Sequence, residues 1–191
     1  MLVNLLVAAC ENGDKTTVDK LISGGICVDT VDDDGRTALM AFCDNNQSIE
    51  IAKILLLNNH ADINIQDCHG RTALMISSIS GHYEMVQTLL TCSKHAIKVD
   101  LTDNFGYSAV TLACLSGNID IVKLLVHHRA SIGKSNPVNG LSCFTLACAH
   151  HVGGEIENYL LRRRSIEITK TRLLPIFILY IFLFFSFYLQ Q

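Results

Sequence analysis

Two pairs of adjacent histidines are the residues best suited to metal binding or proton transfer in this sequence, since imidazole is the commonest metal ligand and titrates near neutral pH. The pairs are His127-His128 and His150-His151. Neighbouring residues on a helix point at least a quarter-turn apart, so neither pair forms the i, i+4 arrangement that holds one ion. We therefore interpret both pairs as polar helix ends.

The eight cysteines are a second candidate for chemistry, through metal binding or disulfide formation. No C-x-x-C pair occurs, and four cysteines recur at one equivalent position of an internal repeat, where a small side chain suits close helix packing. We expect these four in the core: Cys10, Cys43, Cys114 and Cys148. The others are expected in or near turns: Cys27, Cys68, Cys92 and Cys143. Because the N-terminal residues lack a signal-peptide pattern, we expect reduced thiols in the cytosol and no bound metal.

An acidic run, Asp32-Asp33-Asp34-Gly35, resembles part of a calcium-binding loop. An EF-hand register would place Thr30 at the first ligand position and Ala41 where the bidentate glutamate belongs, which argues against calcium. The sequence also lacks the G-x-x-x-x-G-K-[ST], H-E-x-x-H and G-x-S-x-G motifs. We therefore predict a protein that is not an enzyme, with no catalytic residue, no cofactor and no small-molecule substrate.

The composition fits a folded protein that does not bind nucleic acid. Hydrophobic residues make up 49% of the 191 residues and charged residues 17%, which excludes wholesale disorder. The formal net charge is −3, and lysines and arginines are scattered rather than gathered in a stripe that would follow a phosphate backbone. Nucleic acid is therefore not an expected partner.

A short motif that begins with glycine recurs along the chain. Gly35-Arg36-Thr37-Ala38-Leu39-Met40 returns as Gly70-Arg71-Thr72-Ala73-Leu74-Met75, then as Gly106-Tyr107-Ser108-Ala109, and more loosely from Gly140. The steps between these glycines are 35, 36 and 34 residues. Over residues 1–164 the period and the motif resemble the ankyrin repeat, whose T-P-L-H-x-A signature follows a β-turn.

The resemblance implies an all-α repeat solenoid, built of helix-loop-helix pairs with β-hairpin fingers. The apolar composition of the C-terminal segment, described below, adds a C-terminal hydrophobic helix. We expect about five units, at residues 1–29, 30–65, 66–101, 102–135 and 136–164, with the first unit as an N-terminal cap. Three or more stacked units suffice for stability, because each unit buries its apolar side against its neighbours.

The residue types within each unit fit this architecture on physical grounds. An aspartate three residues before the glycine can bond the backbone of a tight turn, and a hydroxyl after the glycine can cap the first helix. The turn aspartates are Asp32, Asp67 and Asp103, and the capping residues are Thr37, Thr72 and Ser108. Pro137 replaces the aspartate in the fifth unit. Arg129 and His60 stand where a glycine would end the second helix, and a left-handed backbone there costs about 1 kcal/mol.

In ankyrin-like stacks, partners usually dock on the finger tips and on the exposed side of the inner helices. The corresponding finger residues here are Asp33, Asp34, Arg36, His69, Arg71, Asn104, Phe105 and Tyr107. Those along the inner helices are Asp44, Asn45, Ile79, Ser80, Leu115 and Ser116. Arg36 and Arg71 are placed to fork onto a carboxylate of the partner, while Phe105 and Tyr107 supply aromatic area. The alternative is that both arginines bond the next finger.

The C-terminal segment differs from the repeats. Residues 173–189 read LLPIFILYIFLFFSFYL without a charge, and as a helix they would span about 26 Å, the short end of a transmembrane helix. A basic linker at 165–172 precedes the segment, which would leave the repeats in the cytosol by the positive-inside rule. Two other interpretations stay open: a helix that caps the fifth unit, or a foreign tail from a misread frame.

Two functions remain for the chain. The first is a non-enzymatic scaffold or adaptor in the cytoplasm that binds a partner protein on its concave face, with a membrane anchor at residues 173–189 as its added feature. The second is the regulatory ankyrin portion of a larger multidomain protein, such as a channel, a kinase or a ubiquitin-ligase subunit. Function has to be argued from a site, because the fold alone does not fix it.

Overall fold

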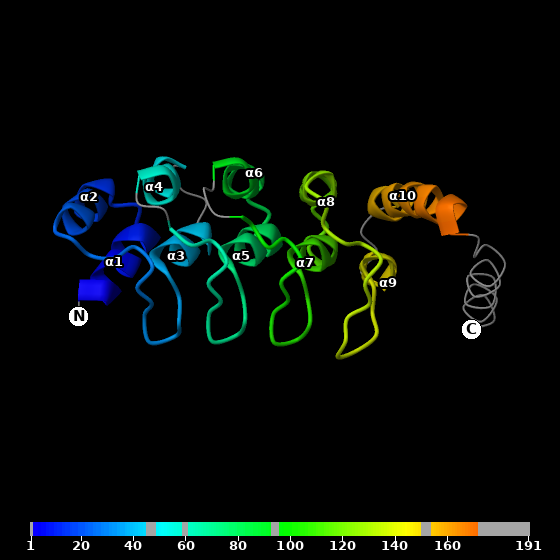
Figure 1. The fold of residues 1–191 in the computed structure, drawn as a ribbon, viewed down its shortest axis with the longest axis horizontal. Coiled ribbons are helices and arrows are strands. Elements are labelled where there is room, and N and C mark those ends of the chain that lie inside the picture. Colours follow the sequence, from blue (N-terminus) through cyan, green and yellow to red (C-terminus); the bar gives the residue numbers. More distant parts are fainter. Residues whose placement is uncertain (1, 45–48, 59–60, 93–95, 150–153, 172–191) are drawn as a thin grey trace.

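The helices of this protein lie in two parallel rows (Figure 1). The computed structural model describes residues 2–44, 49–58, 61–92, 96–149 and 154–171. The inner row holds α1 (Leu2–Glu11), α3 (Ala38–Asp44), α5 (Ala73–Ile79), α7 (Ala109–Leu115) and α9 (Cys143–Ala149). The outer row holds α2 (Lys15–Ser23), α4 (Glu50–Lys53) with the π-helical turn η1 (Ile54–Asn58), α6 (Tyr83–Cys92), α8 (Ile119–His127) and α10 (Glu155–Thr171). The described helices thus form five antiparallel pairs, and the predicted repeat solenoid is confirmed.

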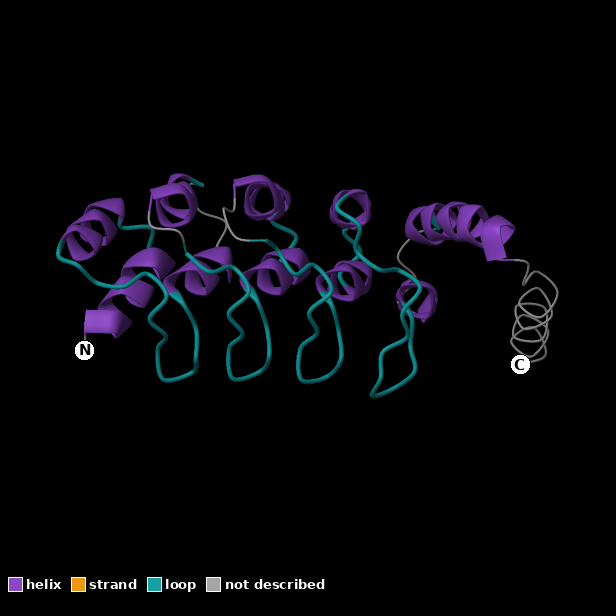
Figure 2. Cartoon of the chain, in the orientation of Figure 1, coloured by secondary structure: helices purple, strands orange, loops and turns teal. Residues whose placement is uncertain are grey.

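Finger-like loops extend from the inner row on the side away from the outer row (Figure 2). They are centred on Gly35, Gly70, Gly106 and Gly140, the glycines of the recurring motif. In the described part of the chain the fingers contain no extended strand. The pairs Val31–Thr37 and Thr102–Ser108 form single antiparallel bridges at the base of two fingers. The expected β-hairpins are therefore tight turns, each closed over only a few residues.

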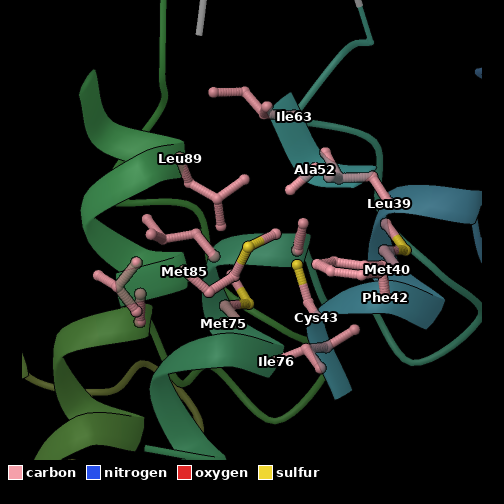
Figure 3. Packing of buried hydrophobic residues seen from close by; sticks show 14 of the residues in the cluster. Leu39, Met40, Phe42, Cys43, Ala52, Ile63, Met75, Ile76, Met85 and Leu89 are labelled. Carbon is pink, nitrogen blue, oxygen red and sulfur yellow. The ribbon is translucent and has the colours of Figure 1, made fainter. Parts of the chain in front are cut away.

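The three central inner helices, α3, α5 and α7, are short and mostly apolar, which is typical of helices buried on nearly every side. All residues from Ala38 to Cys43 of α3 are buried, and α5 and α7 repeat this pattern. Figure 3 shows Phe42 and Cys43 from α3 facing Met75 and Ile76 from α5, with side chains of the outer row above them. Each inner helix packs on the next along the row, and together they form one continuous core. The small residues that permit this approach are buried: Ala9, Ser77, Ala113 and Ala147.

The outer helices are amphipathic, as their helical spacing of apolar residues predicts. On α2, α6 and α8 the stacking face contains one or two completely buried residues, and their neighbours pack against the core. The fully buried examples are Val18, Val86, Leu89, Val122 and Leu125. Charged and polar residues between them are exposed: Asp19, Lys20, Glu84, Gln87, Asp120 and Lys123. The polar side of the outer row is therefore exposed to solvent.

The predicted helix caps form in two of three cases. The hydroxyl of Thr37 accepts a hydrogen bond from the Met40 amide at 3.2 Å, and that of Thr72 accepts one from the Met75 amide at 3.3 Å. Ser108 precedes α7 but makes no such bond, so its predicted capping role is wrong. The reason is local: Thr111 places a second hydroxyl 3.3 Å from Ser108 Oγ, and the two hydroxyls bond each other.

Each finger takes the number of its unit, so the four fingers are the second to the fifth. In the fifth finger, the prediction that Pro137 takes the aspartate's place is wrong. Asn136 takes that role, because its Oδ1 accepts hydrogen bonds from the amides of Val138 at 2.7 Å and Asn139 at 3.3 Å. The Gly140 amide closes the turn onto the Asn136 carbonyl at 2.8 Å. This finger is thus one residue longer than the others, and an asparagine amide oxygen serves as well as a carboxylate.

The last helix is longer than the unit boundary at residue 164 implies. Helix α10 continues to Thr171, through most of the residues predicted as a linker. Its sequence contains neither proline nor glycine, so nothing local ends it earlier. The apolar segment 173–189 lies outside the described residues. Among the helices that are described, none combines the length and apolar character required to cross a bilayer.

Arg129 adopts the left-handed backbone predicted for it, with φ of 67°. Because a side chain at this φ is strained, Arg129→Gly is expected to raise the free energy of unfolding by about 0.5 kcal/mol, after glycine's own entropy cost is subtracted. Urea denaturation followed by far-UV circular dichroism measures the change. His60, the other residue with this prediction, lies outside the described residues.

Gly25 provides the control, since it ends α2 at φ of 86° with no atom within 4 Å of the place of a Cβ. Gly25→Ala introduces the strain that Arg129→Gly removes, and is expected to lower stability by about 1 kcal/mol. A gain in stability from Gly25→Ala would contradict this account of both positions.

Candidate protein-binding surface

The turn aspartates shape each finger as predicted. Asp32 Oδ1 accepts hydrogen bonds from the amides of Asp34 at 3.0 Å and Arg36 at 2.7 Å. The same pair of bonds recurs in the next two fingers, where Asp67 and Asp103 each accept from the amides two and four residues onward. One side-chain oxygen thus satisfies two backbone donors that the turn would otherwise leave unpaired.

Neighbouring fingers are joined to each other near their tips. The Cys68 amide donates to the Asp34 carbonyl at 3.0 Å, and the Asn104 amide donates to the His69 carbonyl at 2.9 Å. In the last step Asn136 Nδ2 donates to the Phe105 carbonyl at 2.8 Å. Backbone groups that a partner would have to desolvate are therefore already bonded within the chain, and the fingers form one continuous row.

The units are also held in register at the inner helices. His82 Nδ1 lies 2.9 Å from the Cys43 carbonyl oxygen, and Asn118 Nδ2 donates to the Ser78 carbonyl at 3.4 Å, at the equivalent place one unit later. A further ladder joins successive units at the loops after the outer helices. There Asp29, Asn64 and Asp100 each accept from an amide of the next unit, at 2.8 to 2.9 Å.

The two arginines predicted to reach a partner are engaged inside the chain. Arg71 forks onto Asp67 of its own turn, with Nε and Nη2 2.9 and 2.8 Å from Oδ2, and the Asp67 side chain is fully buried. Arg36 pairs with Glu11 of α1 at 3.1 Å and lies 4.0 Å from Asp44 of α3. Neither guanidinium bonds the next finger. Both stabilise the base of the surface.

The two aromatic residues of the fourth finger differ in exposure. Phe105 is 62% exposed at the tip. Tyr107 is half-buried against the core, and its hydroxyl accepts a hydrogen bond from Asn139 Nδ2 at 2.8 Å. Phe105 therefore offers apolar area to a partner, whereas Tyr107 joins the fourth finger to the fifth.

The remaining predicted residues fall into three groups. Those exposed on the fingers are Asp33, Asp34, His69 and Asn104, and those exposed on the inner helices or at their ends are Asp44, Ile79, Ser80 and Ser116. Leu115 is half-buried and packs against the core. Asn45 lies outside the described residues. Figure 1 shows the fingers in one row beside the inner helices, which carry the other exposed residues.

The fifth finger carries surface residues that the sequence-based prediction missed. Val138 is 69% exposed and Leu141 is 38% exposed, and Pro137 is exposed beside them. Val138 follows the turn residue Asn136 by two positions, as Phe105 follows Asp103. Aligning the fingers on their turn residue rather than on glycine would have revealed Val138 as the counterpart of Phe105.

Comparison with known proteins supports the same architecture. A family model described as "Ankyrin repeats (3 copies)" matches residues 5–103, and a model of the single ankyrin repeat matches residues 105–137. The chain belongs to the ankyrin-repeat family. Ankyrin repeats are protein-interaction modules, and no catalytic family is indicated for this chain.

The similar proteins are much longer than this ankyrin-repeat chain. The potassium channel AKT2/3 of Arabidopsis thaliana is 25% identical over 155 residues, covering 66% of the chain and 19% of the channel. Inversin of Gallus gallus is 34% identical over 124 residues, covering 64% of the chain and 11% of inversin. The human photoreceptor ankyrin repeat protein is 34% identical over 88 residues, 43% of the chain and 19% of that protein. The chain thus spans less than a fifth of the length of each.

The cysteines of the ankyrin stack follow the prediction with two corrections. Cys10, Cys43 and Cys114 are buried as expected. Cys148 is exposed, because α9 is the last inner helix of the described chain and no further inner helix covers it. Cys143 is buried rather than in a turn, and its hydrogen bond with Cys114, together with burial, raises the pKa of the Cys114 thiol. Within the described residues no three histidine, cysteine or acidic side chains are grouped as metal ligands.

These positions predict which thiols react with a water-soluble reagent. Burial raises the pKa of the Cys10 thiol to about 12 and that of Cys43 still further, so both are expected to resist iodoacetamide in the folded chain. Exposed Cys27 and Cys68 are expected to react first. For Cys148, partial burial raises the pKa to about 11, and its alkylation rate should still be rising with pH above about 10. Peptide mapping after timed alkylation checks this order, and early labelling of Cys43 would contradict it.

Proposed function

We propose that the chain is a non-enzymatic scaffold that holds a partner protein on its finger tips and along the exposed side of its inner helices. The observation that carries the proposal is that each finger uses one set of groups for its own structure and leaves another set exposed. Backbone groups and turn side chains are used to build and join the fingers, whereas tip side chains such as Asp34, His69 and Phe105 are exposed. Such a surface offers varied side chains on a framework already in place.

The finger row is preorganised, and this favours the binding of a partner. Association costs free energy whenever loops or side chains have to be ordered, and a fixed framework lowers that cost. The bonds between neighbouring fingers at 2.8 to 3.0 Å fix the tips relative to each other before any partner arrives. A partner can therefore contact several tips at once without having to order them.

The test compares proximity labelling by the full chain and by a variant that changes exposed tips only. Suitable changes are Asp33→Asn, Asp34→Asn, Phe105→Ser and Val138→Ser, since each side chain is exposed and the turn bonds there use the backbone. Changes at Arg36 or Tyr107 are unsuitable because they also break contacts inside the chain. The labelled set is expected to lose specific proteins with the tip variant.

A control variant alters the outer row instead. Asp19→Asn, Glu84→Gln and Tyr83→Ser change similar charge and apolar area on α2 and α6, at exposed positions. It should label the same proteins as the unchanged chain. An identical loss from both variants, or no loss from the tip variant, would remove the basis for placing the partner on the fingers.

The second candidate function is the regulatory ankyrin portion of a longer protein. It is favoured by one observation, that the chain covers 19% of AKT2/3, 11% of inversin and 16% of the tyrosine-protein kinase HTK16 of Hydra vulgaris. An antibody against the fingers distinguishes the candidates on an immunoblot of the source tissue. A band near 21.1 kDa supports the separate scaffold, and a band several times heavier supports the multidomain protein.

We further propose that the scaffold acts in the cytoplasm and that residues 173–189 tether it to a membrane. The proposal rests on the uncharged, apolar sequence of this segment and on the basic residues that precede it. Carbonate extraction of cell membranes tests the tether. The full chain should stay in the pellet, whereas a chain ending at residue 172 should be released.

A further inference from the structure

The exposed finger tips change character along the row. Two residues after each turn residue stand Asp34, His69, Phe105 and Val138, in order from the second unit to the fifth. The first of these is acidic, the second titratable, and the last two apolar. Apart from the turn residue Asp103, whose carboxylate accepts two backbone amides, the fingers and inner helices of the last two units contain no aspartate, glutamate, lysine or arginine over residues 104–118 and 136–149. The row is therefore charged at one end and uncharged at the other.

The charged end is acidic. Asp33 and Asp34 are both exposed at the second unit's finger. At the base of that finger, Arg36 is held between Glu11 and Asp44, so its positive charge is already matched by carboxylates. With the turn residue Asp32, five carboxylates thus accompany one guanidinium, and the excess negative charge lies at the exposed tip. This end favours a cation and repels phosphate.

The uncharged end is an apolar patch shared by two fingers. Phe105 and Val138 are 62% and 69% exposed, and Leu141 is 38% exposed. The hydrogen bond from Asn136 to the Phe105 carbonyl holds the two fingers side by side. Large apolar side chains clustered on rigid turns are typical of interface centres, whereas single exposed ones need no explanation.

From this polarity we propose that the finger row binds an extended segment of a partner protein with basic residues at one end and apolar residues at the other. The basic end lies over Asp33 and Asp34, and the apolar end over Phe105 and Val138. The inference rests on the proposed scaffold function and adds the chemistry of the partner. Charge complementarity at one end and apolar burial at the other fix the direction in which the segment lies.

The geometry of the stack sets the spacing of the two ends. Helices that pack side by side are about 8 to 10 Å apart, so three steps from the second finger to the fifth cover about 25 to 30 Å. An extended chain advances about 3.3 Å per residue. The basic and apolar groups of the segment should therefore be separated by roughly eight or nine residues.

Selection from a displayed library of random peptides, long enough to span the row, tests the proposal with the full chain as bait. Peptides retained at low salt are expected to carry lysine or arginine at one end and leucine, isoleucine or phenylalanine at the other, with the predicted separation. For individual synthetic peptides, Asp33→Asn with Asp34→Asn should weaken binding about tenfold and remove most of its salt dependence. Phe105→Ser with Val138→Ser should weaken it by about as much but leave the salt dependence in place.

The outcomes separate this inference from the proposed function. Peptides that require the finger tips but show no basic-to-apolar polarity overturn the inference and leave the scaffold function standing. Peptides that bind both tip variants as well as the unchanged chain overturn the use of the fingers altogether. The outer-row variant, with Asp19→Asn, Glu84→Gln and Tyr83→Ser, should bind every selected peptide normally. Self-association of the chain that the tip variants abolish would show that a second copy occupies the row, and would also overturn the inference.

Discussion

Asp67→Ala is expected to lower the free energy of unfolding by about 3 kcal/mol. The Asp67 side chain is fully buried and accepts three hydrogen bonds, from the amides of His69 and Arg71 and from Arg71 Nε, and it also pairs with Arg71 Nη2 at 2.8 Å. Alanine leaves both amides without their acceptor and the guanidinium without its partner. Since Arg71 is 41% exposed, water replaces part of the loss, which keeps the estimate below that for a wholly buried ion pair. Urea denaturation followed by circular dichroism measures the change.

Asp103→Ala is the matched control for this prediction. Asp103 accepts the same two backbone bonds, at 3.0 and 2.8 Å, but a tyrosine stands where Arg71 stands in the preceding finger. The expected loss is about 1 to 2 kcal/mol, so the difference from Asp67→Ala measures the guanidinium contacts. Arg71→Ala removes the guanidinium instead of the carboxylate, and its loss in free energy of unfolding should be similar to that difference. If Asp67→Ala and Asp103→Ala lower the free energy of unfolding equally, the ion pair contributes nothing to stability.

The sequence was sufficient for the framework because the framework depends on local chemistry. The turn needs a side-chain acceptor two and four residues before its amide donors and a glycine at a fixed distance. These needs select the same residue types in the second, third and fourth units. Asp32, Asp67 and Asp103 could therefore be assigned their bonds from spacing alone, and the structure confirms them. The buried small residues of the inner helices could be predicted for the same reason.

The errors arose where one inserted residue or one distant contact decides the outcome. An extra residue in the fifth finger moves the turn acceptor to Asn136, and alignment on Gly140 then points to Pro137 instead. The pairing of Arg36 with Glu11 joins residues that are distant in sequence and adjacent only after α1 packs on α3. The exposure of Cys148 likewise depends on which elements pack against α9. Such features depend on packing between units, which the pattern within one unit does not contain.

The row of fingers also depends on the absence of a side chain at Gly70. Its φ is 76°, and a Cβ there would lie 2.8 Å from the Asn104 amide nitrogen and 2.6 Å from Asn104 Oδ1. The side chain of Asn104 can rotate away, but its amide is held by the His69 carbonyl at 2.9 Å. Gly70→Ala is therefore expected to separate the third and fourth fingers and to lower the free energy of unfolding by about 2 to 3 kcal/mol.

Gly140→Ala distinguishes the contact between fingers from the cost of the backbone conformation. Gly140 has a similar φ of 71°, but no atom lies within 4 Å of the position of its Cβ, so only the conformational cost of about 1 kcal/mol applies. Amide hydrogen exchange adds a local measurement: the Asn104 amide should lose protection in Gly70→Ala and keep it in Gly140→Ala. Equal destabilisation by the two variants, with the Asn104 amide still protected, would mean that the added methyl group is accommodated without separating the fingers. In that case the close approach at Gly70 would not be what holds the third and fourth fingers together.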